Sequence, residues 1–204
     1  DYYSKLGSKV FFVPNAIDIK SLPSGFDTRY EKQIIFAGRL SKEKGILTIL
    51  ETAKNLPKDV HLIIIGTGPE ENIVIESAKN LENVHFFGYQ PKEKTIPLIR
   101  GSILLIQPSF AEGISATLLE SMACKTPIIA TNIGGNNELF VHNKTGILIE
   151  PGNPNELLKE IMRMLNDKNL RDEIARSAYD DVQKYDWSNV GQLYLDLYEK
   201  LLKS

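Results

Sequence analysis

The sequence predicts an α/β protein with a Rossmann-like, doubly wound sheet of about six parallel strands and helices on both faces. Short continuous runs of Ile, Leu, Val and Phe alternate with longer amphipathic segments, a pattern typical of parallel strands joined by helical crossovers. Three of these apolar runs end directly at Gly38, Gly66 or Gly88, where the chain must turn. From residue 155 onward the pattern is helical throughout, which predicts a helical C-terminal segment.

The elements follow in a regular order. Residues 9–13 form a short β-rich run. Residues 18–31 are polar and include Pro23 and Gly25, which predicts an irregular linker. Strands are then predicted at residues 33–37, 61–65, 84–87, 103–106, 127–130 and 146–149. Helices are predicted at residues 44–56, at 70–81, up to about 100, from about 115, after a Gly134-Gly135 turn, and in three C-terminal pieces broken near Asp167 and Tyr185.

Length and composition bound the function. The 204 residues suffice for one sizeable domain, and a formal net charge of -2 with a pI near 6.0 argues against nucleic acid as a partner. The only cysteine, Cys124, lies in an apolar helical segment, so we expect a buried thiol and a reducing compartment, the cytoplasm. No apolar run approaches the ~18 residues that cross a membrane.

The chain begins with Asp1 and not with Met, which predicts that it is an excerpt of a longer protein. We expect residues 1–26 to be a connection from a preceding domain and residues 27–204 to form the folded domain. Right-handed crossovers place every strand-to-helix loop on one rim of the sheet, and ligands of such sheets bind there.

Two cations stand on that rim. Arg39 directly follows the first strand, and Lys44 lies where the next helix begins. A cation at a helix N-terminus opposes the helix dipole, so stability alone does not favour Lys44 there. Bound phosphate would make both cations favourable at these positions, because the planar guanidinium of Arg can donate two parallel hydrogen bonds to it and the ammonium of Lys acts as a point charge. The alternative is a solvated surface pair.

The stretch from Pro108 to Ala123 is the strongest candidate for a ligand site. A loop with Glu112 leads into a helix whose first free N–H groups form an anion cradle, although Ser115 could also be its N-cap. Glu120 lies in an otherwise apolar segment and could accept hydrogen bonds from a diol such as ribose. These residues predict a pocket for a polar, phosphate-bearing ligand.

Other ligand classes lack their motifs. The first strand ends in Gly38-Arg-Leu-Ser-Lys and not in Gly-x-Gly-x-x-Gly, and no Gly-Lys-Ser/Thr loop occurs. The three histidines, His61, His85 and His142, are scattered, and the two that flank strands are predicted to be structural. There is neither a Cys/His cluster for zinc nor an Asp-x-Asp loop for a metal-bound diphosphate. We therefore expect no metal and no cofactor.

Five motifs resemble one family when taken together. They are Val13-Pro-Asn-Ala-Ile-Asp18, Gly38-Arg-Leu-Ser-Lys-Glu-Lys-Gly45, Gly66-Thr-Gly-Pro69, Glu112 with Glu120, and Gly134-Gly-x-x-Glu138. In this order, over essentially the whole chain, they resemble the C-terminal, donor-binding half of group 1 (family 4) retaining glycosyltransferases of the GT-B fold. Gly113-Ile114-Ser115 stands where the family often has Gly-Phe-Gly, which leaves the sugar preference open.

The resemblance implies a role for each matched residue. Arg39, Lys44 and Glu112 would be catalytic: the cations would bind the diphosphate, and Glu112 the sugar hydroxyls. Glu120 would bind the ribose. The full set implied to bind a nucleotide sugar is Gly38, Arg39, Lys44, Tyr89, Gln90, Glu112, Gly113, Ile114, Ser115, Ala116, Thr117 and Glu120. Within it, Tyr89 and Gln90 would meet the base, residues 113–115 the sugar, and residues 116–117 the distal phosphate.

The function implied is transfer of a hexose-type sugar from a UDP-, GDP- or ADP-linked donor, with retention and without a metal. The acceptor domain would be an N-terminal half that this chain lacks, so the isolated chain is expected to be inactive. The closing helix, with Trp187 and Tyr194, would return toward that half, which could also attach to the cytoplasmic face of a membrane. One alternative is a non-catalytic nucleotide-binding or regulatory module on the same fold; an epimerase is a more distant one.

Overall fold

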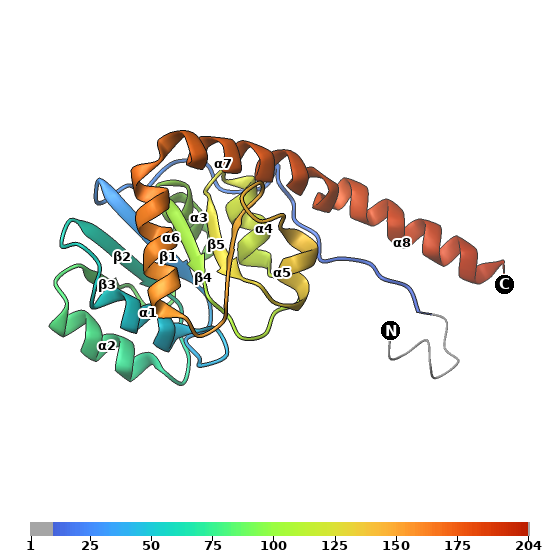
Figure 1. Ribbon diagram of the computed structural model, residues 1–204. Coiled ribbons are helices and arrows are strands. Elements are labelled where there is room, and N and C mark those ends of the chain that lie inside the picture. The colour runs from blue at the N-terminus through green and yellow to red at the C-terminus, as the bar shows by residue number, and fades with distance from the viewer. Residues whose placement is uncertain (1–9, 204) are drawn as a thin grey trace.

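The computed structural model describes residues 10–203, in which six parallel strands form one sheet (Figure 1). Along the sheet the strands are ordered β3-β2-β1-β4-β5-β6. Their bounds are β1 Lys32–Ala37, β2 Val60–Ile65, β3 Val84–Phe86, β4 Leu104–Gln107, β5 Ile128–Thr131 and β6 Ile147–Ile149. The order reverses between β1 and β4, as in Rossmann-type folds, so the predicted fold class is confirmed.

Helices follow the strands at the predicted places. They are α1 Ile46–Ala53, α2 Glu71–Asn80, α3 Lys92–Arg100, α4 Ala116–Ala123, α5 Gly134–Leu139, α6 Pro154–Asn166, α7 Lys168–Val182 and α8 Trp187–Leu202, with a 3-10 turn, η2, at Gln183–Tyr185. The predicted C-terminal breaks are confirmed. Asp167 caps α7 by accepting from the Leu170 N–H, and Asp186 caps α8 by accepting from the Ser188 N–H.

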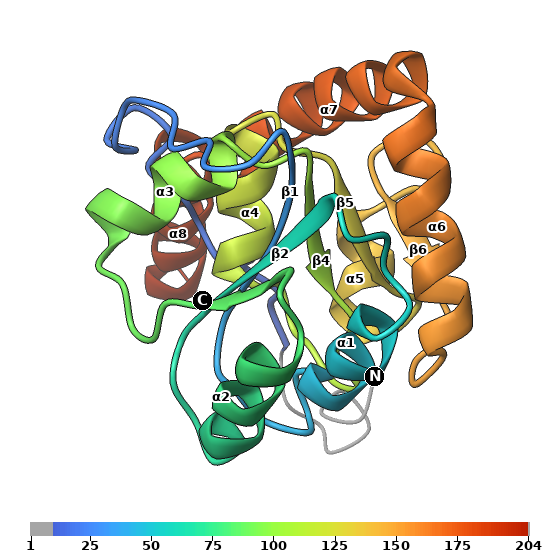
Figure 2. The same ribbon diagram turned by 90° about the vertical axis from the view of Figure 1, so that its left-hand side faces the viewer.

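The core has two layers because successive strand side chains point to opposite faces of the sheet. Ile34 and Phe36 of β1 pack in a cluster with α1 and α6, whereas Ile35 packs in a second cluster with α3 and α4 (Figure 2). Helix α7 contributes to both clusters, through Ile174 to the first and Ala178 to the second. Burial on both faces explains why the strands read as continuous apolar runs.

Two details of the predicted order are wrong. The predicted strand at 9–13 is not a strand over its described part, residues 10–13, and Phe12 is 71% exposed there; Lys9 lies outside the described residues. Apolar and aromatic residues favour a strand only where a neighbouring strand pairs with them. Gly134 and Gly135 are not a turn before a helix but the first residues of α5.

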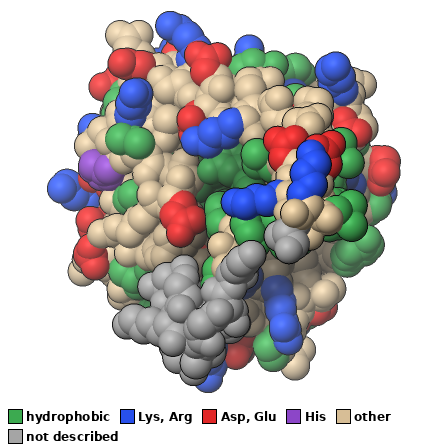
Figure 3. Space-filling view, turned by 90° about the vertical axis from the view of Figure 1, so that its right-hand side faces the viewer, with side chains coloured by type: hydrophobic (Ala, Val, Ile, Leu, Met, Phe, Trp, Pro, Cys, Tyr) green, Lys and Arg blue, Asp and Glu red, His purple; other side chains and the backbone are tan. Residues whose placement is uncertain are grey.

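The lead-in segment and α8 leave the domain on the same side (Figure 1). Backbone hydrogen bonds of 2.9 Å tie Ile17 to Tyr185 and Trp187, at the start of α8. Farther along, the Lys200 ammonium lies 5.1 Å from the centroid of the Phe11 ring. Helix α8 leaves several large apolar side chains exposed, among them Leu195 and Tyr198. Figure 3, which views this side of the molecule, shows hydrophobic side chains gathered near the middle of the face.

Within residues 10–203, no helix combines the length and the apolar character needed to span a bilayer.

Cys124 provides a test of the packing around α4. Its side chain is buried in the second core cluster, and this burial raises the pKa of the thiol to about 11. Because the thiolate is the reactive form, the folded chain should react very slowly with a chromogenic disulfide reagent at pH 8, and one equivalent should react once denaturant is added. Rapid stoichiometric reaction of the folded chain would contradict this packing.

Candidate functional site

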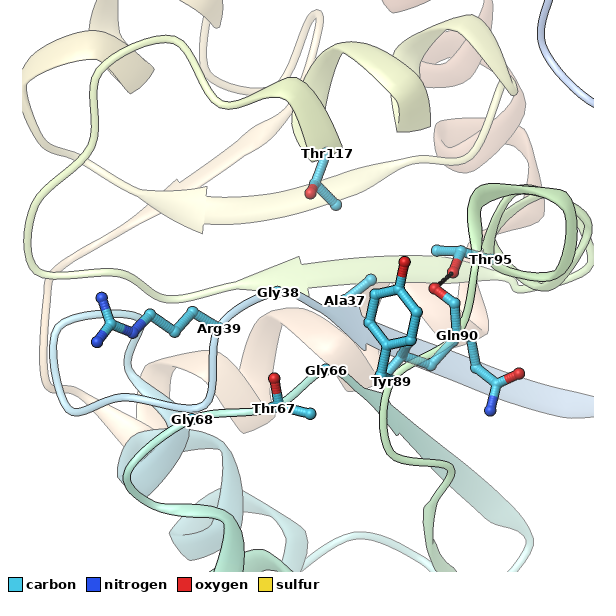
Figure 4. A pocket seen from close by; sticks show the side chains of 11 residues that line it. Ala37, Gly38, Arg39, Gly66, Thr67, Gly68, Tyr89, Gln90, Thr95 and Thr117 are labelled. Atoms are coloured by element: carbon cyan, nitrogen blue, oxygen red, sulfur yellow. Dashed lines mark hydrogen bonds between the residues drawn. The ribbon is translucent and has the colours of Figure 1, made fainter.

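A cavity of about 440 Å³ lies where the strand order reverses, at the carboxyl ends of β1 and β2 and beside the start of α4 (Figure 4). Its lining comprises Ala37, Gly38, Arg39, Ile65, Gly66, Thr67, Gly68, Tyr89, Gln90, Thr95 and Thr117. Five of these were predicted from sequence to bind the ligand: Gly38, Arg39, Tyr89, Gln90 and Thr117. This position is where open α/β sheets bind their ligands.

Glycines bring the first two loops of the rim together. A Cβ on Gly66 would lie 1.8 Å from the carbonyl oxygen of Gly38, and the φ of Gly66 is +134°, a value that L side chains rarely adopt. The two loops are also joined by hydrogen bonds, from the Gly38 N–H to Ile65 O and from the Leu40 N–H to Thr67 O. The floor of the cavity is therefore mostly backbone, which lets a ligand approach closely.

Glu112, in the loop between β4 and α4, is the centre of a polar cluster. Its side chain is only 6% exposed. Three side chains donate hydrogen bonds to its Oε1: Lys44 Nζ at 2.6 Å, Gln107 Nε2 at 2.6 Å and Ser109 Oγ at 2.9 Å. Two predicted catalytic residues, Lys44 and Glu112, thus form an ion pair. Three donors on one oxygen fix the orientation of the Glu112 carboxylate.

The loop that carries Glu112 is held tightly on two sides. On one side, a Cβ on Gly45 would lie 1.9 Å from the carbonyl oxygen of Pro108. On the other, a Cβ on Gly135 would lie 2.3 Å from the carbonyl oxygen of Gly113. Only glycine allows these approaches without moving backbone, so the Gly45 and Gly134-Gly135 motifs position the Glu112 loop.

The N-terminus of α4 is open. Ser115 occupies the N-cap position, but its hydroxyl does not cap the helix. Instead, Ser115 Oγ accepts a hydrogen bond of 3.2 Å from Gln107 Nε2. No acidic side chain lies in the first turn, and Thr117 lines the cavity. The first N–H groups of α4 and the positive end of its dipole are consequently left for an anion from the cavity side.

The second carboxylate, Glu120, lies one turn farther along α4. Its side chain is 19% exposed and forms an ion pair of 3.2 Å with Lys92, at the start of α3. The Tyr89-Gln90 loop forms the neighbouring wall of the cavity. The Gln90 amide donates to Phe87 O and the Gln90 carbonyl accepts from Thr95 Oγ1, so this loop offers a fixed backbone while the Tyr89 ring is exposed (Figure 4).

The remaining predicted residues do not line the cavity. They are Lys44, Glu112, Gly113, Ile114, Ser115, Ala116 and Glu120. Asn15 of the lead-in segment reaches this group, because its Nδ2 donates to Ile114 O at 2.6 Å.

Sequence reasoning missed several residues. Gly66, Thr67 and Gly68 line the cavity and belong to a recognised motif, yet they were not assigned to the site. Thr95, in the middle of α3, carried no signal. Gln107 was interpreted only as the residue that ends an apolar run, and Ser109 lay in the candidate stretch without a role of its own.

The sequence suggested that the three histidines are scattered, but two of them lie together in the structure. His61 and His85 stack with Tyr30, and His61 Nδ1 lies 3.0 Å from His85 Nε2. Burial lowers the pKa of His85, with the nearby His61 as a second cause. The trio lies near the first residues of β1, β2 and β3, at the opposite end of the sheet from the cavity. Across residues 10–203, no three His, Cys, Asp or Glu side chains are grouped so that they could hold a metal ion.

Comparisons with known proteins match most of the chain. The model of the family described as "Glycosyl transferases group 1" matches residues 25–181. An uncharacterized glycosyltransferase of Methanocaldococcus jannaschii is 28% identical over 171 residues, which cover 82% of this chain and 48% of the relative. The chain spans about half the length of the curated relatives it matches.

Two solved structures are similar as well. One is the C-terminal domain of a group 1 glycosyl transferase family protein (LpcC) from Francisella tularensis, with a TM-score of 0.71 and 25% identity, covering 83% of this chain and 98% of that one. The other is a TarM variant from S. aureus in complex with fondaparinux, α-GlcNAc-glycerol and UDP, with a TM-score of 0.81 and 25% identity, covering 94% of this chain and 40% of that one.

Proposed function

This chain belongs to the group 1 glycosyl transferases, and on that premise we propose that it is the donor-binding domain of a retaining enzyme that transfers a hexose-type sugar. The observation that carries the proposal is one arrangement: Arg39 and Thr117, at the open N-terminus of α4, line a cavity at the reversal of strand order, and Lys44 and Glu112 form an ion pair between the segments that follow β1 and β4. Residues 27–204 would form the nucleotide-sugar-binding domain and residues 1–26 its connection to an N-terminal acceptor domain.

The positive groups would bind the diphosphate. Arg39 lines the cavity, and the ammonium of Lys44 lies 2.6 Å from the Glu112 carboxylate. The N–H groups of Ala116 and Thr117 would meet the distal phosphate. Glycosyl transfer passes through an oxocarbenium-like centre as the phosphate leaves, so fixed positive groups at the departing oxygens lower the barrier. With this charge supplied by the protein, the proposal includes no metal and no cofactor.

The carboxylates would bind the sugars. Glu112 would hold hydroxyls of the transferred sugar, together with backbone groups of residues 113–115. Because all three described hydrogen bonds to its carboxylate go to Oε1, Oε2 is the oxygen that would face the sugar. Glu120 would accept from the ribose hydroxyls, and the Tyr89-Gln90 loop would contact the base. The UDP complex of the similar TarM structure supports a nucleoside diphosphate as the shared ligand.

The missing partner would be the acceptor-binding half of the protein. The exposed apolar side chains of α8 and the lead-in segment, which leave the domain together, would contact that half. We place the whole protein in the cytoplasm, with membrane attachment, if any, through the missing half.

The test compares the complete protein with this chain. Both should bind a nucleoside diphosphate, but only the complete protein should transfer sugar, and the anomeric proton of its product should show retained configuration by NMR. Inversion would contradict the mechanism. Nucleotide binding by a complete protein that turns over no donor, across a panel of UDP-, GDP- and ADP-sugars and acceptors, would instead favour the non-catalytic module.

A further inference from the structure

We infer that Gln107 is a positioning residue that sets the orientation of Glu112 and keeps the N-terminus of α4 open; this inference rests on the proposed function. Gln107 is the last residue of β4, and its side chain contacts residues of the segment that joins β4 to α4. Its Nε2 bridges two groups, donating to Glu112 Oε1 at 2.6 Å and to Ser115 Oγ at 3.2 Å.

The position of Gln107 on a strand makes it a rigid support. The residue is 3% exposed, and β4 pairs with β5 at this point, where Gln107 lies opposite Ala130. Glu112, by contrast, lies in a loop between β4 and α4. Side chains on strands hold a geometry more precisely than side chains on loops. A hydrogen bond from the strand residue Gln107 therefore restrains the position of the Glu112 carboxylate.

The orientation of the amide is determined by Glu112. Among the described residues, Gln107 Oε1 is buried without a hydrogen-bond partner, a condition that is unfavourable and uncommon in folded proteins. Rotating the amide by half a turn would place Oε1 against the Glu112 carboxylate, and two acceptors would then face each other. The protein thus tolerates one unpaired oxygen, and the NH₂ group points at Glu112 and Ser115.

The Gln107 amide therefore acts on two parts of the proposed donor site, the Glu112 carboxylate and the N-terminus of α4. By holding Glu112 Oε1 it directs Oε2 toward the sugar, and by engaging Ser115 Oγ it draws the hydroxyl away from the N–H groups of α4. The orientation of Glu112 affects the affinity for a sugar nucleotide but not that for the bare nucleoside diphosphate, because only the sugar nucleotide carries the sugar hydroxyls that Glu112 would bind. Loss of Gln107 should act on this difference.

The experiment uses Gln107→Met, which keeps length and removes the amide. The unsubstituted chain is first titrated with UDP, GDP and ADP and with the corresponding sugar nucleotides. For the base that binds best, the dissociation constants of the nucleoside diphosphate and of its sugar nucleotide are then measured by calorimetry in each variant. We expect the ratio of the diphosphate Kd to the sugar-nucleotide Kd to fall about tenfold, the size of one hydrogen bond to a charged group. In a Glu112→Ala background the same substitution should leave the ratio unchanged, since the two residues act as a unit.

Gln33→Met is the matched control. Gln33 is also a fully buried glutamine, but it lies in β1 at the other end of the sheet, where its Nε2 donates to Leu98 O and Ser102 Oγ. Its loss should lower thermal stability and leave the ratio unchanged. If Gln107→Met does not fold, Gln107→Asn, which keeps the amide but is too short to bridge both groups, should show the same fall.

An unchanged ratio in a folded Gln107 variant, or a fall that persists in the Glu112→Ala background, would overturn the inference while leaving the proposed function intact. Failure of the unsubstituted chain to bind any nucleoside diphosphate would overturn the proposed function, and the inference with it.

Discussion

Replacing Arg39 by alanine is expected to weaken nucleoside diphosphate binding by roughly 10- to 100-fold, the loss expected for charge-assisted hydrogen bonds to phosphate. Arg39 lines the cavity from the loop after β1, and that loop is tied to the loop after β2 by two backbone hydrogen bonds. The backbone that carries the guanidinium is therefore fixed, so that ligand binding has only the side chain of Arg39 to order.

Calorimetric titrations with UDP, GDP and ADP measure this loss. Arg176→Ala is the control, because Arg176 is an exposed arginine on α7, whose residues do not line the cavity. Glu120→Ala should also weaken binding, by about tenfold, through loss of the ribose contacts. Unchanged affinity in both Arg39→Ala and Glu120→Ala would show that the nucleotide does not bind where we place it.

Replacing Gly66 by alanine is expected to destabilise the fold by roughly 3 kcal/mol or more, since strain and backbone overlap act together. The added Cβ would lie 1.8 Å from the carbonyl oxygen of Gly38, and the φ of +134° is unsuited to alanine. For a chain of this size, such a loss lowers the melting temperature by roughly 10 °C.

Thermal unfolding followed by circular dichroism measures the effect. Gly191→Ala is the matched control, because Gly191 lies within α8 and its added Cβ would meet nothing within 4 Å. Alanine is the better helix former, so this variant should be as stable as the unsubstituted chain or slightly more stable. Equal melting temperatures for Gly66→Ala and Gly191→Ala would contradict the close packing of the two rim loops.

The fold could be predicted from the sequence because local and global signals agree. In the run at 33–37, residues 34–37 are apolar and lie in the middle of the sheet, buried on both faces, so their composition reflects their environment. The run at 9–13 has a similar composition, but no strand pairs with its described part. Propensity alone cannot tell these two cases apart, because pairing is a tertiary property.

The candidate site could be predicted only where a residue's type carries its chemistry. Arg39 and Glu112 stand out as charges after apolar strands; in the structure Arg39 lines the cavity and Glu112 is paired with Lys44. The pairing of Lys44 with Glu112 joins residues 68 positions apart, which no local pattern encodes. The same holds for His61 and His85, which are brought together by the pairing of β2 with β3.

The most direct test of the account is the position of bound nucleotide on this chain. The 22.9 kDa chain is within reach of amide-detected NMR, and saturating UDP, GDP or ADP can be added to a labelled sample. We predict that the largest amide shift changes fall on the rim, at Gly38, Thr67, Tyr89 and Thr117. Changes confined instead to the separate cavity between α5 and α7, around Asn137, Lys144 and Asp180, would contradict it.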